Sequence, residues 1–231
     1  MLTLAIDTAT KTLSAALLAE GFVLAETFLN LKANHSLVLL PVIEDICRRA
    51  GVELEEVDLF ACTVGPGSFT GLRIGLSTVK GFALATGKPA AGVSTLEALA
   101  FNVLHASMMI CPMLDARKEQ VYAALFRASR AGELEAVQEE RLTDPASLLR
   151  DTEGDILFLG DGAQRYRSLI RETLPERSFF ASGHHQFIRA AAVGLLGEMK
   201  YRNGDLLDLM SFTPRYLRAS EAEVKQPKAA D

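Results

Sequence analysis

One spacing of apolar strands occurs twice along this sequence, and it constrains the fold more than any other feature. The segments "IDTATKTLSAALLAEG" and "LDARKEQVYAALFRAS" each contain an aspartate, Asp7 or Asp115, followed eight residues later by Ala-Ala-Leu. Farther along, "DLFACTVGPG" from residue 58 and "DILFLGDGAQ" from residue 155 each have a glycine seven residues after the first aspartate. Chance similarity between two apolar meanders is the alternative explanation. We expect an internal duplication that divides the chain near residues 106–110.

The first copy is expected to contain three strands, a helix, a strand and a second helix. Residues 2–7, 13–19 and 22–29 are short, apolar and separated by turn residues, which predicts an antiparallel meander. A helix over 36–50, a buried strand over 58–64 and a helix over 71–86 follow. Ser36 is expected to cap the first helix, and Pro41 inside it is expected to kink the axis.

Two copies of this unit indicate an α/β fold of the duplicated ribonuclease-H-like type, with two mixed-sheet lobes. Actin, Hsp70 and the sugar kinases (the ASKHA proteins) have this arrangement, and they bind nucleotide in the cleft between the copies. We expect a partner-binding N-terminal lobe over 1–107, a C-terminal lobe over 108–218 and a disordered tail over 219–231. In the second half, the helix content is split between "AQRYRSLIRETL" and "HHQFIRAAAVGLLGEMKYR".

Composition narrows the class of protein. With 231 residues, 49% hydrophobic content and a net charge of -5, the chain is expected to fold and to bind nucleic acid poorly by itself. Its three cysteines, Cys47, Cys62 and Cys111, are too widely spaced for a disulfide framework and are expected to be buried free thiols. There is no basic leader and no apolar run of ~18 residues, so we expect a cytoplasmic protein that does not enter a membrane.

The glycine-rich stretch "ACTVGPGSFTGLRIG" matches neither common phosphate-binding motif. A Walker A loop needs Lys and then Ser or Thr after its last glycine, whereas Leu-Arg follows Gly71. The dinucleotide fingerprint fails because Gly71 comes one position too late after Gly65 and Gly67. What remains is a flexible turn before a helix that Ser68 or Thr70 can cap, a general setting for an anion.

The glycine spacing favours a second interpretation of the same stretch. Gly71 and Gly75 are four residues apart, and Gly81 and Ala85 repeat that spacing. Small residues on one helix face allow another helix to approach closely. We therefore expect a docking surface in preference to a phosphate cradle, with the cradle kept as the alternative.

A vestigial nucleotide cleft is the corresponding hypothesis for the strand ends. In actin-like ATPases an aspartate at the end of the first strand holds magnesium-bound phosphate, and Asp115 would face Asp7 from the second copy. Aspartate at these positions can equally close a tight turn. The candidate residues are Asp7, Thr8, Thr10, Gly65, Gly67, Ser68 and Asp115.

Metal ligands and nucleophiles are not evident in the sequence. The four histidines are His35, His105, His184 and His185. No two of them form an HxxxH or HExxH pair on one helix face, so no metal site is predicted. Neither Cys47 nor Ser68 has a base that the sequence places beside it, so no catalytic residue is predicted.

Six segments resemble a known family in sequence and in order. They are "LAIDTAT", "HSLVLLPVI", "GPGSFTGLRIG", "GVSTLEALA", "LDARKEQVY" and "PRYLR". The chain is similar to the TsaB (YeaZ) family from residue 2 to about residue 218. This family belongs to the machinery that makes threonylcarbamoyladenosine at position 37 of tRNAs that read ANN codons.

The resemblance implies a pseudoenzyme with an actin-like fold. The related subunit TsaD performs the transfer and holds a metal with an HxxxH helix, and its histidine positions fall on Thr95 and Leu99 here. It implies a homodimer, a heterodimer with TsaD, and a ternary complex with the ATPase TsaE. No cofactor of its own is implied; ATP or ADP would bind in the complex with TsaD and TsaE, and tRNA only through that complex.

The partner interface is expected on the two helices of the first half. The segment "SLVLLPVIEDICRRA" is apolar around most of its circumference, so a second covered face is expected. Our hypothesis is that the homodimer and the TsaD complex compete for this surface. The expected residues are His35, Leu39, Leu40, Ile43, Gly71, Ile74, Gly75, Thr78 and Phe82.

Two rival functions remain open from sequence. The first is a nucleotide-dependent phosphotransferase or ATPase of the actin and sugar-kinase class, with Asp7 and Asp115 around magnesium. The second is direct RNA binding through a basic stripe, although charged helix faces are normally solvated. The candidates for that stripe are Arg165, Arg167, Arg171, Lys200 and Arg202.

Overall fold

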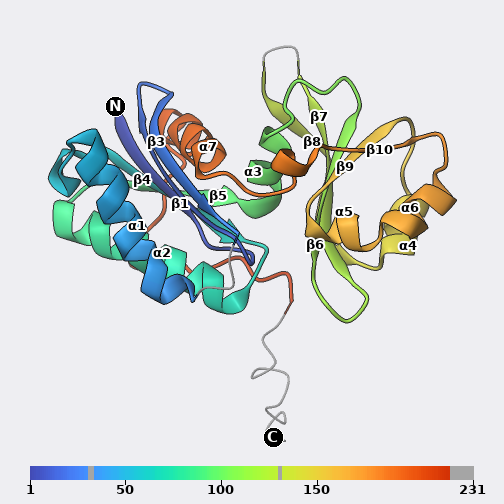
Figure 1. Ribbon diagram of the computed structural model, residues 1–231, viewed down its shortest axis with the longest axis horizontal. Helices are drawn as coiled ribbons and strands as arrows, with labels where there is room; N and C mark the ends of the chain where they lie inside the picture. The colour runs from blue at the N-terminus through green and yellow to red at the C-terminus, as the bar shows by residue number, and fades with distance from the viewer. Residues whose placement is uncertain (31–33, 130–131, 219–231) are drawn as a thin grey trace, which may run out of the picture.

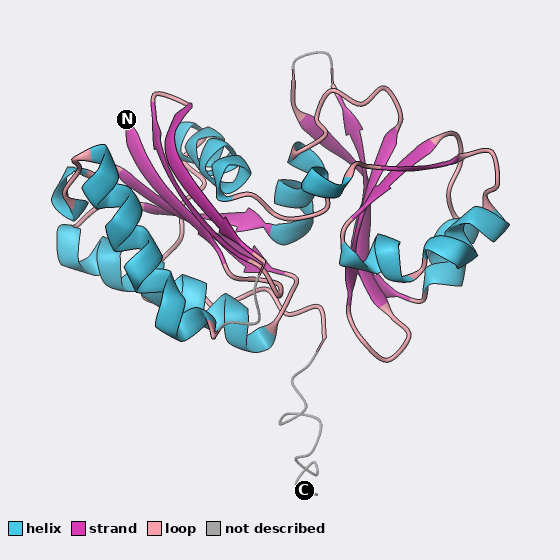
Figure 2. Cartoon of the chain, in the orientation of Figure 1, coloured by secondary structure: helices cyan, strands magenta, loops and turns pink. Residues whose placement is uncertain are grey.

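A computed structural model describes residues 1–30, 34–129 and 132–218 of the chain. It contains two five-stranded mixed sheets, each covered by helices (Figures 1 and 2). The expected disordered tail, 219–231, lies outside the described residues. None of the helices in the described ranges is long and apolar enough to cross a membrane.

The first half of the chain forms the sheet with strand order β3-β2-β1-β4-β5. Strands β1 to β3 are antiparallel, and β4 and β5 run parallel to β1. The three predicted strands of the meander are confirmed with their predicted bounds. The elements are β1 (Leu2–Asp7), β2 (Leu13–Ala19), β3 (Phe22–Leu29), α1 (His35–Ala50), the short η1 (Leu54–Glu56), β4 (Leu59–Gly65), α2 (Phe69–Thr86), β5 (Ala90–Ser94) and α3 (Thr95–Phe101).

The second half repeats this topology. Its sheet has the order β10-β9-β6-β7-β8. If β6 to β10 are matched in sequence with β1 to β5, this is the order of the first sheet read from the opposite edge. Asp7 ends β1 and Asp115 ends β6, as the repeated spacing predicted. The duplicated fold is therefore confirmed. The elements are β6 (Met109–Asp115), β7 (Val121–Ala128), β8 (Leu134–Thr143), α4 (Pro145–Arg150), β9 (Ile156–Leu159), α5 (Asp161–Arg165), α6 (Arg167–Thr173), β10 (Ser178–Phe180), η2 (Gly183–His185) and α7 (Ala190–Arg202).

The two halves exchange their last helices. Helix α3 packs on β6, β7 and β8 of the second sheet as well as on β4 and β5 of the first, while α7 packs on the strands of the first sheet (Figure 1). Small residues allow α7 to lie close to the first sheet: a Cβ at Gly197 would stand 2.7 Å from the Cβ of Ala61. Helix α7, which lies within the expected C-terminal lobe 108–218, therefore packs on the sheet of the first half. The division into lobes at residue 107 stays a prediction.

One continuous apolar core joins the lobes through the exchanged helices. It contains Leu18 and Val93 from the first sheet, Ile110 and Phe126 from the second, and Val193 from α7. The opposite face of each sheet has a core of its own, under α1 and α2 in the first lobe and under α4 to α6 in the second. The three cysteines are free and buried, as expected.

The first helix begins one residue earlier than predicted. Asn34 is its N-cap, since its Oδ1 accepts a hydrogen bond from the backbone N–H of Ser36 at 3.2 Å. Ser36 is therefore not the cap, because the amide oxygen of Asn34 already satisfies its N–H. Gly51 ends the helix in the left-handed conformation with φ 67°. Pro41 lies inside the helix, and the kink expected there stays a prediction.

Candidate functional site

The glycine loop between β4 and α2 is a junction of three backbone segments. A Cβ at Gly65 would overlap the carbonyl oxygen of Arg215, and one at Gly67 would overlap that of Ala9. A Cβ at Gly71 would likewise overlap the carbonyl oxygen of Thr8. Gly65 also has a φ of 124°, which residues other than glycine rarely adopt. The glycines are therefore required for close approach inside this chain.

The first turn of α2 uses donors that an anion would need. Ser68 is the N-cap, as predicted, with its Oγ accepting from the N–H of Gly71 at 3.2 Å. The N–H of Ser68 donates to the carbonyl of Ala9 at 2.7 Å, and the hydroxyl of Thr8 donates to the carbonyl of Gly71 at 2.7 Å. The loop is thus bonded to the β1–β2 turn, and the N–H groups of Ser68 and Gly71 are already used by acceptors inside the chain.

Four residues of the expected partner interface lie inside the chain. Gly71 and Gly75 are buried against Thr8, and Leu39 and Ile43 are 1% and 4% exposed in the core under the first sheet. For Gly71 and Gly75, the close neighbour that the small residues admit is the β1–β2 turn, while Gly81 and Ala85 of the same expected face are exposed. The docking surface on α2 stays a prediction.

The remaining expected interface residues reach the surface to different degrees. Leu40 is 53% exposed, and His35, Ile74, Thr78 and Phe82 are half-buried. His35 also connects α1 to the β1–β2 turn, with its Nε2 2.9 Å from the carbonyl oxygen of Thr10.

Two exposed leucines of the same helices were missed by sequence reasoning. Leu37 of α1 is 72% exposed and Leu84 of α2 is 58% exposed. Leu37 stands three residues before Leu40, so helical spacing alone places these two on one face, away from Leu39. The outer surfaces of α1 and α2, named here the α1–α2 surface, carry Leu37, Leu40 and Leu84.

Asp7 is completely buried at the end of β1. Its Oδ1 accepts hydrogen bonds from the hydroxyl of Thr63 at 2.7 Å and from the N–H of Ala9 at 3.1 Å. Its Oδ2 has no hydrogen-bond partner in the structure. Burial is the main cause that raises the pKa of this carboxyl from 3.8 to about 6.

Asp115, the counterpart of Asp7, is an ion-paired residue. Its Oδ2 lies 2.7 Å from Nη1 of Arg165, and its Oδ1 accepts from the N–H of Arg117 at 2.9 Å. Each aspartate forms these bonds within its own half of the chain. The expected pairing of Asp7 and Asp115 around one ligand has no support in these contacts.

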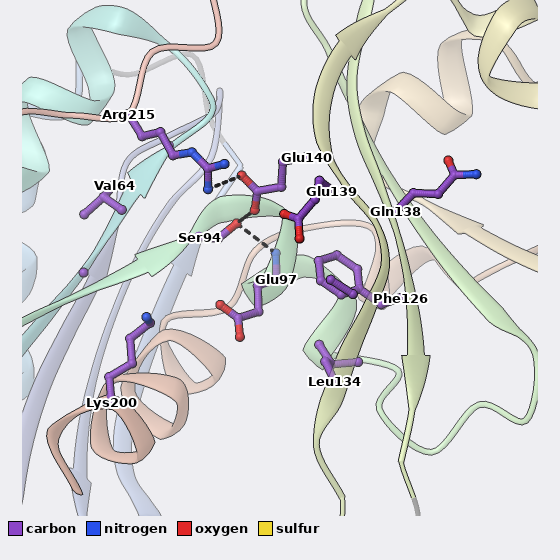
Figure 3. Close-up of a pocket in the computed structure, with 13 residues that line it drawn as sticks. Val64, Ser94, Glu97, Phe126, Leu134, Gln138, Glu139, Glu140, Lys200 and Arg215 are labelled. Atoms are coloured by element: carbon purple, nitrogen blue, oxygen red, sulfur yellow. Dashed lines mark hydrogen bonds and ion pairs between the residues drawn. The ribbon is translucent and has the colours of Figure 1, made fainter. Parts of the chain in front are cut away.

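A cleft of about 290 Å³ lies between the lobes (Figure 3). Its polar side chains come from α3, β8, α7 and the segment after α7, and Phe126 and Leu134 form an apolar wall. Of the expected nucleotide-cleft residues, only Gly65 lines it. The polar lining residues are Ser94, Glu97, Gln138, Glu139, Glu140, Lys200 and Arg215.

Buried carboxylates dominate the electrostatics of this cleft. Glu140 is 7% exposed; it accepts a hydrogen bond from the hydroxyl of Ser94 and forms an ion pair with Arg215 at 3.1 Å, without hydrogen-bond geometry (Figure 3). Burial raises the pKa of both Glu97 and Glu140. Lys200 is held by Asp205 at 2.5 Å. Such a lining is poorly suited to a phosphate, because carboxylates repel it.

Within the described ranges, no three His, Cys, Asp or Glu residues are grouped so that they could hold a metal ion. Thr95 and Leu99, at the positions of the TsaD metal ligands, are both 0% exposed on α3. The rings of His184 and His185 lie 3.8 Å apart and beside Ser182.

The duplicated lobes and exchanged helices define a protein of the actin-like class. One solved structure of this fold is component A of (R)-2-hydroxyglutaryl-CoA dehydratase from Acidaminococcus fermentans. It has a TM-score of 0.51 at 12% identity, covering 87% of this chain and 99% of that one. A likeness at this identity establishes the fold alone.

Closer relatives establish the family. The family model described as TsaD, tRNA N6-adenosine threonylcarbamoyltransferase, matches residues 23–226. The tRNA threonylcarbamoyladenosine biosynthesis protein TsaB of Bacillus subtilis is 34% identical, with 97% of each chain covered. The TsaB of Escherichia coli is 33% identical over 74% of this chain and 75% of its own. YeaZ from Pseudomonas aeruginosa has a TM-score of 0.80 at 29% identity, covering 94% and 99%. The chain belongs to the TsaB (YeaZ) family.

The glycine junction predicts opposite effects for two Gly-to-Ala substitutions in α2. Gly71→Ala places a Cβ on the backbone of Thr8, so it should lower the free energy of unfolding by about 1–3 kcal/mol. Gly81→Ala adds a Cβ with nothing within 4 Å, so it should raise that free energy by about 0.5–1 kcal/mol. Urea denaturation followed by circular dichroism measures both. Equal stability of Gly71→Ala and the wild type would contradict the junction.

The raised pKa of Asp7 predicts a pH-dependent effect of Asp7→Asn. Between pH 3.8 and about 6 the folded state binds a proton at Asp7 that the unfolded state does not. The contribution of Asp7 to the free energy of unfolding therefore falls as pH rises through this range. The free energy of unfolding of Asp7→Asn, measured relative to the wild type, should therefore rise by up to about 3 kcal/mol between pH 4 and pH 7.5. Urea denaturation at both pH values tests this, with exposed Asp155→Asn as control. A pH-independent difference would refute it.

Proposed function

We propose that this chain acts in the formation of threonylcarbamoyladenosine in tRNA as a non-catalytic partner and activator of TsaD. Family membership supports the pathway, since the relatives from Bacillus subtilis and Escherichia coli are named for this biosynthesis. The observation that carries the partner role is the α1–α2 surface, where Leu37, Leu40 and Leu84 are more than half exposed.

The α1–α2 surface has the character of an unoccupied interface. The inner faces of both helices are already covered by the first sheet, so the exposed leucines have no role in this chain's core. The helices α1 and α2 are neighbours (Figure 1), and together they expose three large apolar side chains to water. A partner that buries these side chains would stabilise the complex through the hydrophobic effect. Half-buried Ile74 and Phe82 extend the contact area between them.

The fold favours a partner of related structure. Residues 23–226 match the TsaD family model, so TsaD is expected to have an equivalent pair of helices in its first lobe. Two such pairs can pack as four helices, either between two copies of this chain or between this chain and TsaD. The homodimer and the heterodimer then compete for one surface.

The non-catalytic assignment is supported by the surroundings of the candidate site residues. Thr95 and Leu99 are fully buried, and Asp115 forms an ion pair with Arg165. The glycine loop is packed against the backbone of Thr8, Ala9 and Arg215. In this proposal the chain needs no cofactor of its own. ATP or ADP belongs to the assembly with TsaD and TsaE, tRNA is contacted through that assembly, and the work takes place in the cytoplasm.

Leu40→Arg tests the partner role. Calorimetry with TsaD should show binding at least about tenfold weaker than for the wild type, because the arginine introduces an unpaired charge at an apolar contact. Reconstituted threonylcarbamoyl transfer to tRNA should fall with it, and TsaD without this chain should be least active. Phe22→Arg is the matched control, since Phe22 is 77% exposed on β3, away from α1 and α2. Unchanged affinity for Leu40→Arg would overturn the assignment.

The kinase-like alternative has a separate test. Titration of the purified chain with ATP and magnesium should give no binding at micromolar concentrations and no hydrolysis, since the loop that would hold phosphate is bonded to the β1–β2 turn. Tight binding with turnover, abolished by Asp7→Asn, would replace the partner role with an enzymatic one.

A further inference from the structure

The segment after α7 crosses from the first lobe to the second. Its beginning lies along the edge of the first sheet: the N–H of Leu207 donates to the carbonyl of Ala90 at 2.8 Å, and that of Arg215 donates to the carbonyl of Val64 at 2.8 Å. Phe212 packs against the core between the first sheet and its outer helices. The segment is thus fixed to the first lobe before it reaches "PRYLR", residues 214–218.

Tyr216 fastens these last residues to the start of α2. Its ring stacks on that of Phe69, with centroids 4.0 Å apart and planes 14° from parallel. The guanidinium of Arg73 lies 4.2 Å from the Phe69 centroid, and its Nε donates to the Tyr216 hydroxyl at 3.1 Å. This cluster is a rigid support, because a stacked aromatic pair and an arginine fork hold one another in place.

The two arginines beside Tyr216 reach the other lobe. Arg215 crosses the cleft to Glu140 of β8 (Figure 3). Arg218 donates from Nη1 to the carbonyl of Ala116 and from Nη2 to Oε1 of Gln120, the latter at 2.5 Å. One side of the cleft is therefore spanned by side chains that originate on the first lobe and end on the second.

The turn that Arg218 contacts is conformationally costly. Arg117, Lys118 and Glu119 have φ values of 59°, 50° and 58°, so three consecutive non-glycine residues are left-handed. Such a run is unfavourable for L-residues unless contacts around it hold it. Arg218 bonds to Ala116 and Gln120, the residues on either side of the run.

We propose that residues 214–218 form an interlobe latch. Tyr216 is its anchor, while Arg215 and Arg218 fix the angle between the lobes and hold the left-handed turn of residues 117–119. The core shared through α3 and α7 joins the lobes as a hinge would, and the latch restrains rotation about it. Arg215 is exposed and Arg218 is half-buried, and each leaves from an irregular segment and not from a helix or strand, so the latch can open without unfolding either lobe.

Spin-label distances between the lobes test the latch. Nitroxides at Ser77→Cys on α2 and Glu172→Cys on α6, in a Cys47→Ala background, report the lobe angle; Cys62 and Cys111 are too buried to react. The Arg215→Ala/Arg218→Ala variant should shift the mean distance by more than about 2 Å or give a second population. Arg150→Ala, an exposed arginine within the second lobe, is the matched control and should leave the distance unchanged.

Amide exchange provides the second measurement. The N–H groups of Ala116 and Gln120 are bonded within the turn, and they should exchange about tenfold faster when Arg218 is replaced. Arg218→Gln is a milder variant if the double substitution unfolds the protein, and Tyr216→Ala should reproduce the distance change by removing the anchor. Wild-type distances in a folded double variant would overturn control of the lobe angle. Wild-type exchange in Arg218→Gln would overturn control of the turn.

Discussion

Each half of the chain places its last helix, α3 or α7, against the sheet of the other half. Leu96 and Leu99 of α3 lie in the same core as Val193 and Leu196 of α7, together with residues of both sheets. The inner face of the first sheet is covered mainly by α7 from the other half, while α3 lies between the two sheets and contacts both. The two lobes are consequently one folding unit around a single shared core, and the cleft is the space that this core does not fill.

The duplicated strands were predictable because the apolar runs and the turn residues between them are local properties of the sequence. Ala15–Leu17 and its counterpart, residues 123–125, lie within β2 and β7, although the partner of the first alanine shifts by one position, from Ile6 in β1 to Met113 in β6. The exchange of helices was not predictable, since an apolar helix face does not specify which sheet will cover it. The same limit applies to Gly71 and Gly75. Their small size indicates a close neighbour, but it does not indicate whether that neighbour is a partner protein or, as the structure shows, Thr8 of the same chain.

The candidate site shows how duplicated positions diverge. Asp7 and Asp115 end equivalent strands, yet burial raises the pKa of Asp7 while Asp115 forms an ion pair with an arginine. No spacing in sequence indicates such a difference, because Arg165 lies fifty residues from Asp115. A cleft between the lobes was expected, but most of its lining was missed for a similar reason: Glu97, Glu140 and Arg215 come from three distant segments and meet only in the folded chain. By contrast, Leu40 was identifiable from helix period alone.

The glycine loop has a further consequence because of where its neighbours lie in the chain. Thr8 and Ala9 come from the first strand turn, and Arg215 comes from the last described residues, so the loop is enclosed by the two ends of the polypeptide. During translation, residues 65–71 can meet Thr8 early, but the environment of Gly65 stays incomplete until residue 215 has left the ribosome. The N-terminal lobe thus reaches its final form only after the second lobe and residue 215 have been synthesised.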